Sequence, residues 1–233
     1  MNRRKVKKEI FEILKQAELS EITAQVSKYP RSSVINALFM ALCDTDEDVR
    51  WHAVSCFGEL VSSMAETEPE AARVIMRRFL WTLNDESGGI GWGAPEAMAQ
   101  IMCKSSLLRE EYIHMLISYT QEDGDELFQD GNYLELPMIQ RGLLWGIGTL
   151  CHTFPDEMNS RGCSRDLRNY MQADDQQVRR LALWALSGLE VFCSEEFLEP
   201  FTADEGLLNI YVDGVFLDVP MQSIYQKLRA ESV

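Results

Sequence analysis

Four of the five tryptophans in this chain recur at matching positions of four repeated segments, where arginines accompany them. The segments begin at Val49, Ile90, Ile139 and Val178 and align without gaps. Their third and seventh positions hold Trp51 and Ser55, Trp92 and Glu96, Arg141 and Trp145, Arg180 and Trp184. Residues four apart lie on one face of a helix, and Trp and Arg are enriched at the centres of protein interfaces. The pattern therefore predicts a surface that binds a protein or a peptide.

The same tryptophans have a second interpretation, in which they fill the core between successive repeats. Trp145 lies within the apolar run 142–150, which favours burial at that position. Both interpretations stay open from the sequence. We name the predicted partner-binding set the Trp/Arg stripe, and it consists of Trp51, Trp92, Glu96, Arg141, Trp145, Arg180 and Trp184.

A glycine-rich stretch at residues 84–96 adds Asp85 and Glu86 to the predicted partner-binding residues. Four glycines within six residues let the backbone turn sharply or approach a ligand closely. Main-chain N–H groups at the start of the following helix are a potential anion site. No strand is expected before the stretch and no Lys-Ser or Lys-Thr follows it, so it does not match a phosphate-binding loop. The alternative is a plain turn between two helices.

An acidic loop at residues 121–136 lengthens the third repeat. Asp123 and Asp125 flank a glycine, but the ligand spacing and the terminal bidentate Glu of a calcium-binding EF-hand are absent. A solvated loop is the simpler interpretation, and recognition of a partner is the other, because long surface loops often carry binding residues.

Residues suited to catalysis or metal binding are scattered along the chain. The three histidines are His52, His114 and His152, and only His152 has an adjacent cysteine, Cys151. Two adjacent ligands without a second pair are weak evidence for a metal site, and no nucleophile, base and orienting group are grouped as an active site requires. We therefore predict no catalytic residue, no metal and no cofactor, and a protein that is not an enzyme.

The composition of the chain restricts the classes of partner and the cellular compartment that can be expected. The 233 residues carry a net charge of −15, which would repel a nucleic-acid backbone. The longest apolar stretches are far short of a membrane span, so neither a nucleic acid nor a membrane is expected as partner. Six cysteines without a CxxC pair favour a reducing, cytoplasmic location.

The spacing of the segments, 41, 49 and 39 residues, is typical of an α-solenoid with two helices per repeat. Such a chain is all-α, and we expect the solenoid over residues 1–193, with capping helices in 1–30. Residues 194–233 form a predicted C-terminal cap, because Asp213-Gly214 between two β-rich runs favours a hairpin at 208–219, followed by a final helix. The expected helix pairs lie at 33–42 and 47–63, 69–83 and 94–104, 106–119 and 137–152, and 164–173 and 176–192.

The acidic turns and the Val-Arg-x-x-Ala pattern that follows them resemble HEAT repeats of the bacterial phycobilin-lyase-like type. The best matches are residues 46–58 and 174–186, whereas Gly91 and Gln140 replace the arginine in the middle segments. The resemblance implies a HEAT-like solenoid whose second (B) helices line a concave groove, and hence a protein-binding scaffold or adaptor. The alternative that it implies is an accessory lyase or chaperone acting on a cofactor-bearing partner. Di-iron hydroxylases built on similar repeats carry His-Glu pairs, and no histidine here is followed by Glu.

Overall fold

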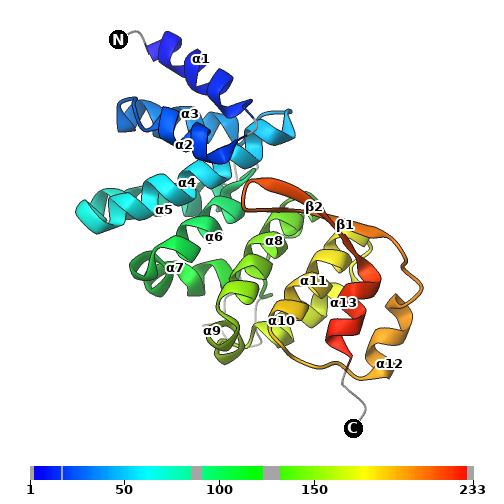
Figure 1. Ribbon diagram of the computed structural model, residues 1–233. Helices are drawn as coiled ribbons and strands as arrows, with labels where there is room; N and C mark the ends of the chain where they lie inside the picture. The colour runs from blue at the N-terminus through cyan, green and yellow to red at the C-terminus, as the bar shows by residue number, and fades with distance from the viewer. Residues whose placement is uncertain (1–2, 17, 85–90, 123–131, 230–233) are drawn as a thin grey trace. The chain divides into compact units, whose positions relative to one another are not determined.

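The computed structural model describes residues 3–16, 18–84, 91–122 and 132–229 (Figure 1). Its elements are almost all helical, with one two-stranded hairpin among the described residues, so the predicted all-α repeat fold with a C-terminal hairpin is confirmed. None of the helices in the described part of the chain has both the length and the apolar character needed to cross a membrane. Internal contacts divide the chain into two compact units, Met1–Ile113 and His114–Val233. The predicted domain boundary between residues 193 and 194 stays a prediction.

The first unit consists of paired helices in the predicted places. Its elements are α1 (Arg3–Leu14), α2 (Leu19–Val26), α3 (Arg31–Ala41), α4 (Glu47–Thr67), α5 (Pro69–Leu83), α6 (Ala94–Lys104) and the larger part of α7 (Ser106–Ser118). Local sequence explains several of the boundaries. The Asp46 side chain accepts hydrogen bonds from the main-chain N–H groups of Asp48 and Val49, which caps α4. Before α6, Gly93 adopts a left-handed conformation with φ of 69°, which a residue with a side chain rarely adopts.

The core of the first unit forms where helices of successive pairs meet. The rings of Phe39, Phe57 and Phe79, from α3, α4 and α5, contact one another with centroids 4.7 to 5.0 Å apart. The B helices α4 and α6 lie side by side, so that a Cβ added to Gly58 would lie 3.2 Å from that of Gln100. The tenth position of the first segment and the eleventh of the second are therefore neighbours.

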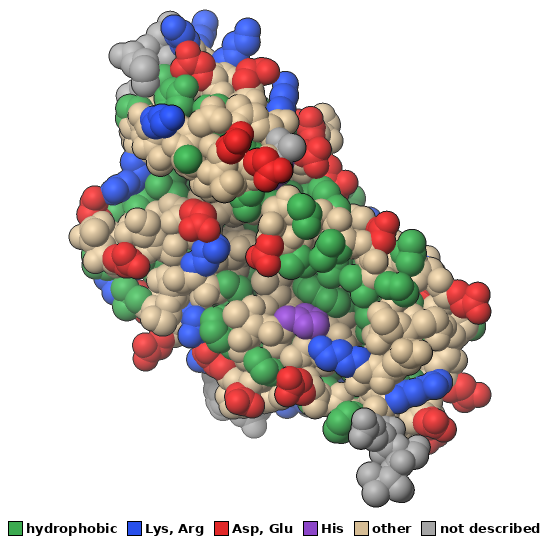
Figure 2. Space-filling view, in the orientation of Figure 1, with side chains coloured by type: hydrophobic (Ala, Val, Ile, Leu, Met, Phe, Trp, Pro, Cys, Tyr) green, Lys and Arg blue, Asp and Glu red, His purple; other side chains and the backbone are tan. Residues whose placement is uncertain are grey.

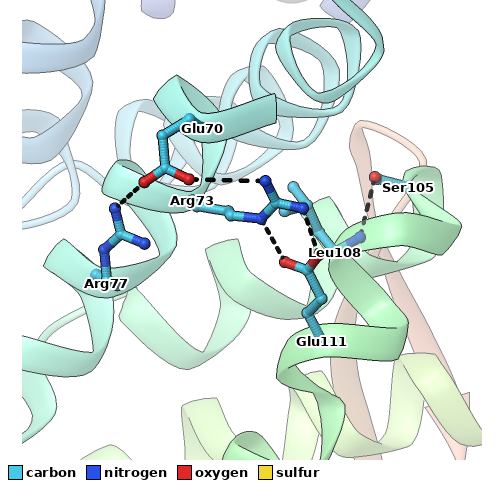
Figure 3. A network of polar contacts seen from close by, with 6 residues as sticks. All are labelled: Glu70, Arg73, Arg77, Ser105, Leu108 and Glu111. Carbon is cyan, nitrogen blue, oxygen red and sulfur yellow. Dashed lines mark hydrogen bonds and ion pairs between the residues drawn. The ribbon is translucent and has the colours of Figure 1, made fainter. Parts of the chain in front are cut away.

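An ion-pair network joins helices α5 and α7 (Figure 3). Arg73 donates to both carboxylate oxygens of Glu111, from Nε at 2.8 Å and from Nη2 at 2.6 Å. Glu70 lies 3.6 Å from Arg73 and accepts a 2.6 Å bond from Arg77. Each of these arginines thus contacts a carboxylate. The two parallel hydrogen bonds between Arg73 and Glu111 fix the spacing between α5 and α7, which are the first (A) helices of successive repeats.

The second unit begins within α7 and includes the whole C-terminal tail. Its further elements are α8 (Pro137–Thr153), α9 (Pro155–Ser160), α10 (Cys163–Asn169), η1 (Tyr170–Gln172), α11 (Gln176–Gly188), α12 (Glu195–Leu198), η2 (Glu199–Phe201), β1 (Leu207–Val212), β2 (Val215–Pro220) and α13 (Met221–Leu228). The predicted helix 164–173 is a short α-helix with a 3₁₀ turn, and α9 precedes it. The predicted helix 176–192 ends early, at Gly188, because Glu190 adopts a left-handed φ of 57°.

The predicted hairpin is present, and its register runs from Leu207 opposite Pro220 to Val212 opposite Val215. Asp213 and Gly214 both have positive φ, 48° and 92°, as a type I′ turn requires. Hydrophobic side chains gather over the hairpin on the face drawn in Figure 2. Leu207, Val215 and Leu217 are its exposed large apolar residues, while Leu208, Ile210 and Tyr211 of β1 are buried.

Candidate functional site

The first unit holds three residues of the Trp/Arg stripe, and all three are half-buried. Trp51 lies on α4, Trp92 lies in the turn just before α6, and Glu96 lies in the first turn of α6. Helices α4 and α6 lie side by side, and Arg50, the residue next to Trp51, is close enough to Glu96 to lower its pKa, so we treat these residues as one surface. We name Trp51, Trp92 and Glu96 the B-helix face of the first unit.

Glu96 has an unusual environment. Its Oε2 atom is buried without a hydrogen-bond partner among the described residues, although the residue as a whole is partly exposed. Burial raises the pKa of the Glu96 carboxyl to about 7, against a weaker opposing effect of Arg50. A buried polar oxygen that lacks a partner is costly, so this carboxyl favours a donor or a cation brought by a ligand.

In the second unit the stripe is covered, and the prediction that Trp145 and Trp184 line an open groove is wrong. Trp145 is only 3 % exposed and Trp184 only 7 %. Trp145 donates its indole N–H to the main-chain oxygen of Tyr211 in β1, at 3.1 Å. Trp184 stacks on His152, with ring centroids 4.9 Å apart, and packs against Gly148. The C-terminal tail and the neighbouring B helix therefore fill the space that a partner would need.

The two arginines of the stripe are likewise held within the chain. Arg180 donates to both carboxylate oxygens of Asp204, at 2.7 and 2.6 Å, and to the main-chain oxygen of Leu207 at 3.1 Å. Arg141 is exposed and pairs with Asp175, the residue that caps α11. Each ion pair lowers the pKa of its carboxyl. Arg180 thus secures the tail, contrary to the prediction that it faces a partner.

The remaining predicted residues, Asp85 and Glu86, lie outside the described residues. Of the neighbouring glycines, Gly91 and Gly93 are described and buried. A Cβ at Gly91 would come within 2.8 Å of Leu83, and one at Gly93 within 2.8 Å of Leu42. Close packing therefore accounts for these two glycines.

Of the histidines and the cysteine singled out in the sequence, His52 and Cys151 are buried, whereas His114 and His152 are exposed. His52 is buried, with Nδ1 2.7 Å from the main-chain oxygen of Leu14. His152 lies with Nε2 3.0 Å from the main-chain oxygen of Trp184, and desolvation of its ring lowers its pKa. Cys151 is buried, which raises the pKa of its thiol. Within the described ranges, no three His, Cys, Asp or Glu side chains group as a metal site would require.

Two functional features were not predicted. The main-chain oxygens of Leu207 and Tyr211 carry no sequence signal as acceptors, because any residue supplies one. Trp81, the fifth tryptophan, is 77 % exposed on α5. The exposure of Trp81 could have been predicted from the helical periodicity of α5. Trp81 falls on the opposite side of this helix from the buried residues Ala72, Ile75, Met76 and Phe79.

Comparison with known proteins agrees with this architecture. None of the curated proteins matches the chain. A crystal structure of computationally designed armadillo repeat proteins for modular peptide recognition is similar over 94% of this chain and 89% of its own, with a TM-score of 0.52 and 14% identity. A crystal structure of an engineered protein covers 98% of this chain and 95% of its own, with a TM-score of 0.49 and 14% identity. The HEAT repeat family model matches residues 34–64, so α4 and most of α3 form a HEAT repeat within an α-α solenoid of the armadillo and HEAT kind.

Proposed function

We propose that this protein is a non-enzymatic scaffold that holds a peptide segment of a partner protein against the B-helix face of its first unit. The observation that carries the proposal is the way in which the second unit binds its own tail. There, a Trp and an Arg of the stripe donate to the main-chain oxygens of Tyr211 and Leu207. Side chains at these helix positions can thus hold a segment of chain.

The tryptophans of the stripe are better exposed in the first unit, where they hold the third position of their segments, than in the second unit, where they hold the seventh. Trp51 and Trp92 are half-buried, whereas Trp145 and Trp184 are 3 % and 7 % exposed. Indole rings supply a large contact area and attract cations to their faces. The B-helix face therefore suits a peptide that brings its own apolar and cationic side chains.

The expected partner segment carries a lysine or an arginine that reaches Glu96. A cation at this buried carboxyl would supply the partner that Oε2 lacks. It would also drive the carboxyl to its charged form, so binding releases a proton near pH 7. Peptide recognition by a designed protein of similar fold supports the proposal at the level of architecture.

Selection from a random-peptide display library tests the proposal. Enriched peptides are measured by isothermal titration against the full chain and its Trp92→Ala, Glu96→Gln and Glu66→Ala variants. We expect enriched peptides to contain Lys or Arg and to bind Trp92→Ala and Glu96→Gln at least ten-fold more weakly. Glu66 is exposed on α4 and contributes nothing to the face, so Glu66→Ala should bind as the wild type does. Equal affinity for all variants would refute the site.

The accessory-lyase alternative makes a different prediction. A partner isolated with this protein would then carry a chromophore, recognised by its visible absorbance. A colourless peptide or protein ligand with the stated dependence on Trp92 and Glu96 favours the scaffold.

A further inference from the structure

A second surface of the first unit exposes large apolar side chains on α3 and α5. Met40 on α3 is 50 % exposed, and Val74 and Trp81 on α5 are 55 % and 77 % exposed. Val74 and Trp81 are seven residues apart and therefore lie on the same side of their helix. Single exposed apolar residues are ordinary, but Val74 and Trp81 share α5 with a cation that is held in place against α3, the helix of Met40.

That cation is Arg78, one turn from both apolar residues of α5. Its guanidinium carbon lies 3.7 Å from the centroid of the Phe39 ring, and its Nη1 donates to Asn36 Oδ1 at 3.2 Å. Phe39 is itself fixed, because its ring packs on two other phenylalanine rings in the core. Arg78 is therefore oriented before any partner arrives, and neither of its contacts neutralises its charge.

Arg78 differs in this respect from the other arginines of its helix. Arg73 and Arg77 both contact carboxylates, whereas Arg78 forms no ion pair with any residue that the structure describes. Lys7 on α1 resembles Arg78, since its ammonium lies 5.4 Å from the Phe11 ring and pairs with no described carboxylate. Neither cation pairs with a carboxylate in the described part of the chain, although the sequence contains 37 acidic and only 22 basic side chains.

A hollow of about 330 Å³ between α1 and α3 borders this surface. Arg4, Lys7, Asn36 and Met40 are among the residues that line it. Asn36 also binds Arg78, so the hollow is continuous with the Arg78 site. We name Lys7, Asn36, Met40, Val74, Arg78 and Trp81 the α3–α5 face.

We propose that the α3–α5 face docks an acidic amphipathic peptide segment of a partner protein, separately from the B-helix face. Leucine or phenylalanine side chains of the segment would cover Trp81 and enter the hollow beside Met40. Its carboxylates would pair with Arg78 and Lys7, which supply the complementary charge. A nucleic acid fits less well, because its phosphate backbone would leave the apolar side chains of Met40, Val74 and Trp81 uncovered.

Fluorescence polarisation with two designed probes tests this assignment. The first is a fluorescein-labelled 18-residue helical peptide with Glu on one face and Leu and Phe at i, i+4 and i+7, and the second has Lys in place of each Glu. Trp81→Ala and Arg78→Gln should each weaken binding of the Glu peptide at least five-fold, and Lys7→Gln should weaken it less. The matched controls are Arg77→Gln, whose arginine pairs with Glu70, and Phe192→Ala, whose side chain is 63 % exposed in the second unit. Both should bind as the wild type does.

Each result decides the proposal. Loss of affinity in Trp81→Ala and Arg78→Gln, at an unchanged melting temperature, supports it. Should the wild type ignore the Glu peptide, prefer the Lys peptide, or bind phosphatidylserine vesicles in place of the peptide, the proposal is wrong. Trp92→Ala distinguishes the two surfaces: if it abolishes binding of the Glu peptide while Trp81→Ala does not, the B-helix face is the site and the α3–α5 face is not.

Discussion

Trp145 of α8 donates its indole N–H to the main-chain oxygen of Tyr211, which follows it by 66 residues. The contact is buried, and Arg180 on the next B helix binds the same tail at Leu207 and Asp204. The chain therefore supplies its own occupant for the stripe of the second unit. Packing of the tail therefore contributes to the stability of α8 and α11.

Replacement of Trp145 by Phe should loosen the tail. The variant loses the hydrogen bond to Tyr211 and part of a buried ring, which costs about 1–2 kcal/mol in the free energy of unfolding. Urea unfolding measures the loss, and hydrogen exchange should show faster exchange of the β1 amides. Trp184→Phe removes the same atoms from another buried site and should leave β1 exchange closer to that of the wild type. Equal exchange in the two variants would show that the indole N–H does not hold the tail.

Gly148→Ala should destabilise the second unit, although alanine normally favours a helix over glycine. The added Cβ would overlap the ring of Trp184 and press on Ala185, and overpacking of this kind costs about 1–3 kcal/mol. Thermal unfolding measures the effect. The double variant Gly148→Ala with Trp184→Leu should recover part of the loss, because the smaller side chain removes the overlap. Full additivity of the two changes would contradict this explanation.

Docking of the tail should weaken in acid. The hydrogen-bonded Arg180 guanidinium lowers the pKa of Asp204 in the folded state. A lowered carboxyl pKa contributes stability that is present above the unfolded value of about 3.9 and is lost as pH falls through the folded value. The protection factors of residues 204–212, which correct for the slower intrinsic exchange in acid, should therefore fall selectively as the pH is lowered towards 3. Asp204→Asn should exchange faster already at pH 7 and show a flatter dependence on pH.

Glu96 should affect the pH dependence of stability in the opposite direction to Asp204, and Glu96→Gln should remove this effect. Burial raises the folded pKa of Glu96 to about 7, above the unfolded value of about 4.3. Between these values the unfolded state releases its proton first, so the wild type loses stability as pH rises, by up to about 3 kcal/mol in total. The glutamine variant should be more stable than the wild type at pH 8 and similar to it at pH 4. Glu66→Gln, at an exposed site of α4, should show neither effect in the same denaturant titrations.

Most of the fold could be predicted from the sequence because the signals are local. Apolar periodicity, the acidic cap before Val49 and proline in the first turn of α5 fixed the helices of the first unit to within a few residues. The hairpin followed from Asp213-Gly214, which favours a turn with positive φ at both residues. The fourth A helix was less regular than predicted, because Gly162 adopts a φ of 82° between α9 and α10.

The exposure of the stripe could not be predicted, because it depends on where a distant segment packs. Glu96 and Trp145 both hold the seventh position of their segments, yet Glu96 is half-buried and Trp145 is buried under β1. A repeat pattern gives the side of the helix on which a residue lies and contains no information about the acceptor at Tyr211. The pattern also directed attention to B helices, although Trp81, the most exposed tryptophan, lies on an A helix.

The long separation between Trp145 and Tyr211 has a consequence for synthesis of the protein. The ion pair between Arg73 and Glu111 spans 38 residues, so helices of the first unit find their neighbours soon after they leave the ribosome. Trp145 of α8 emerges well before β1, and until then its large aromatic ring lacks this cover. Exposed apolar surface of this kind favours aggregation of nascent chains. The nascent chain should therefore need a chaperone most when the ribosome has translated α11 but not yet β1.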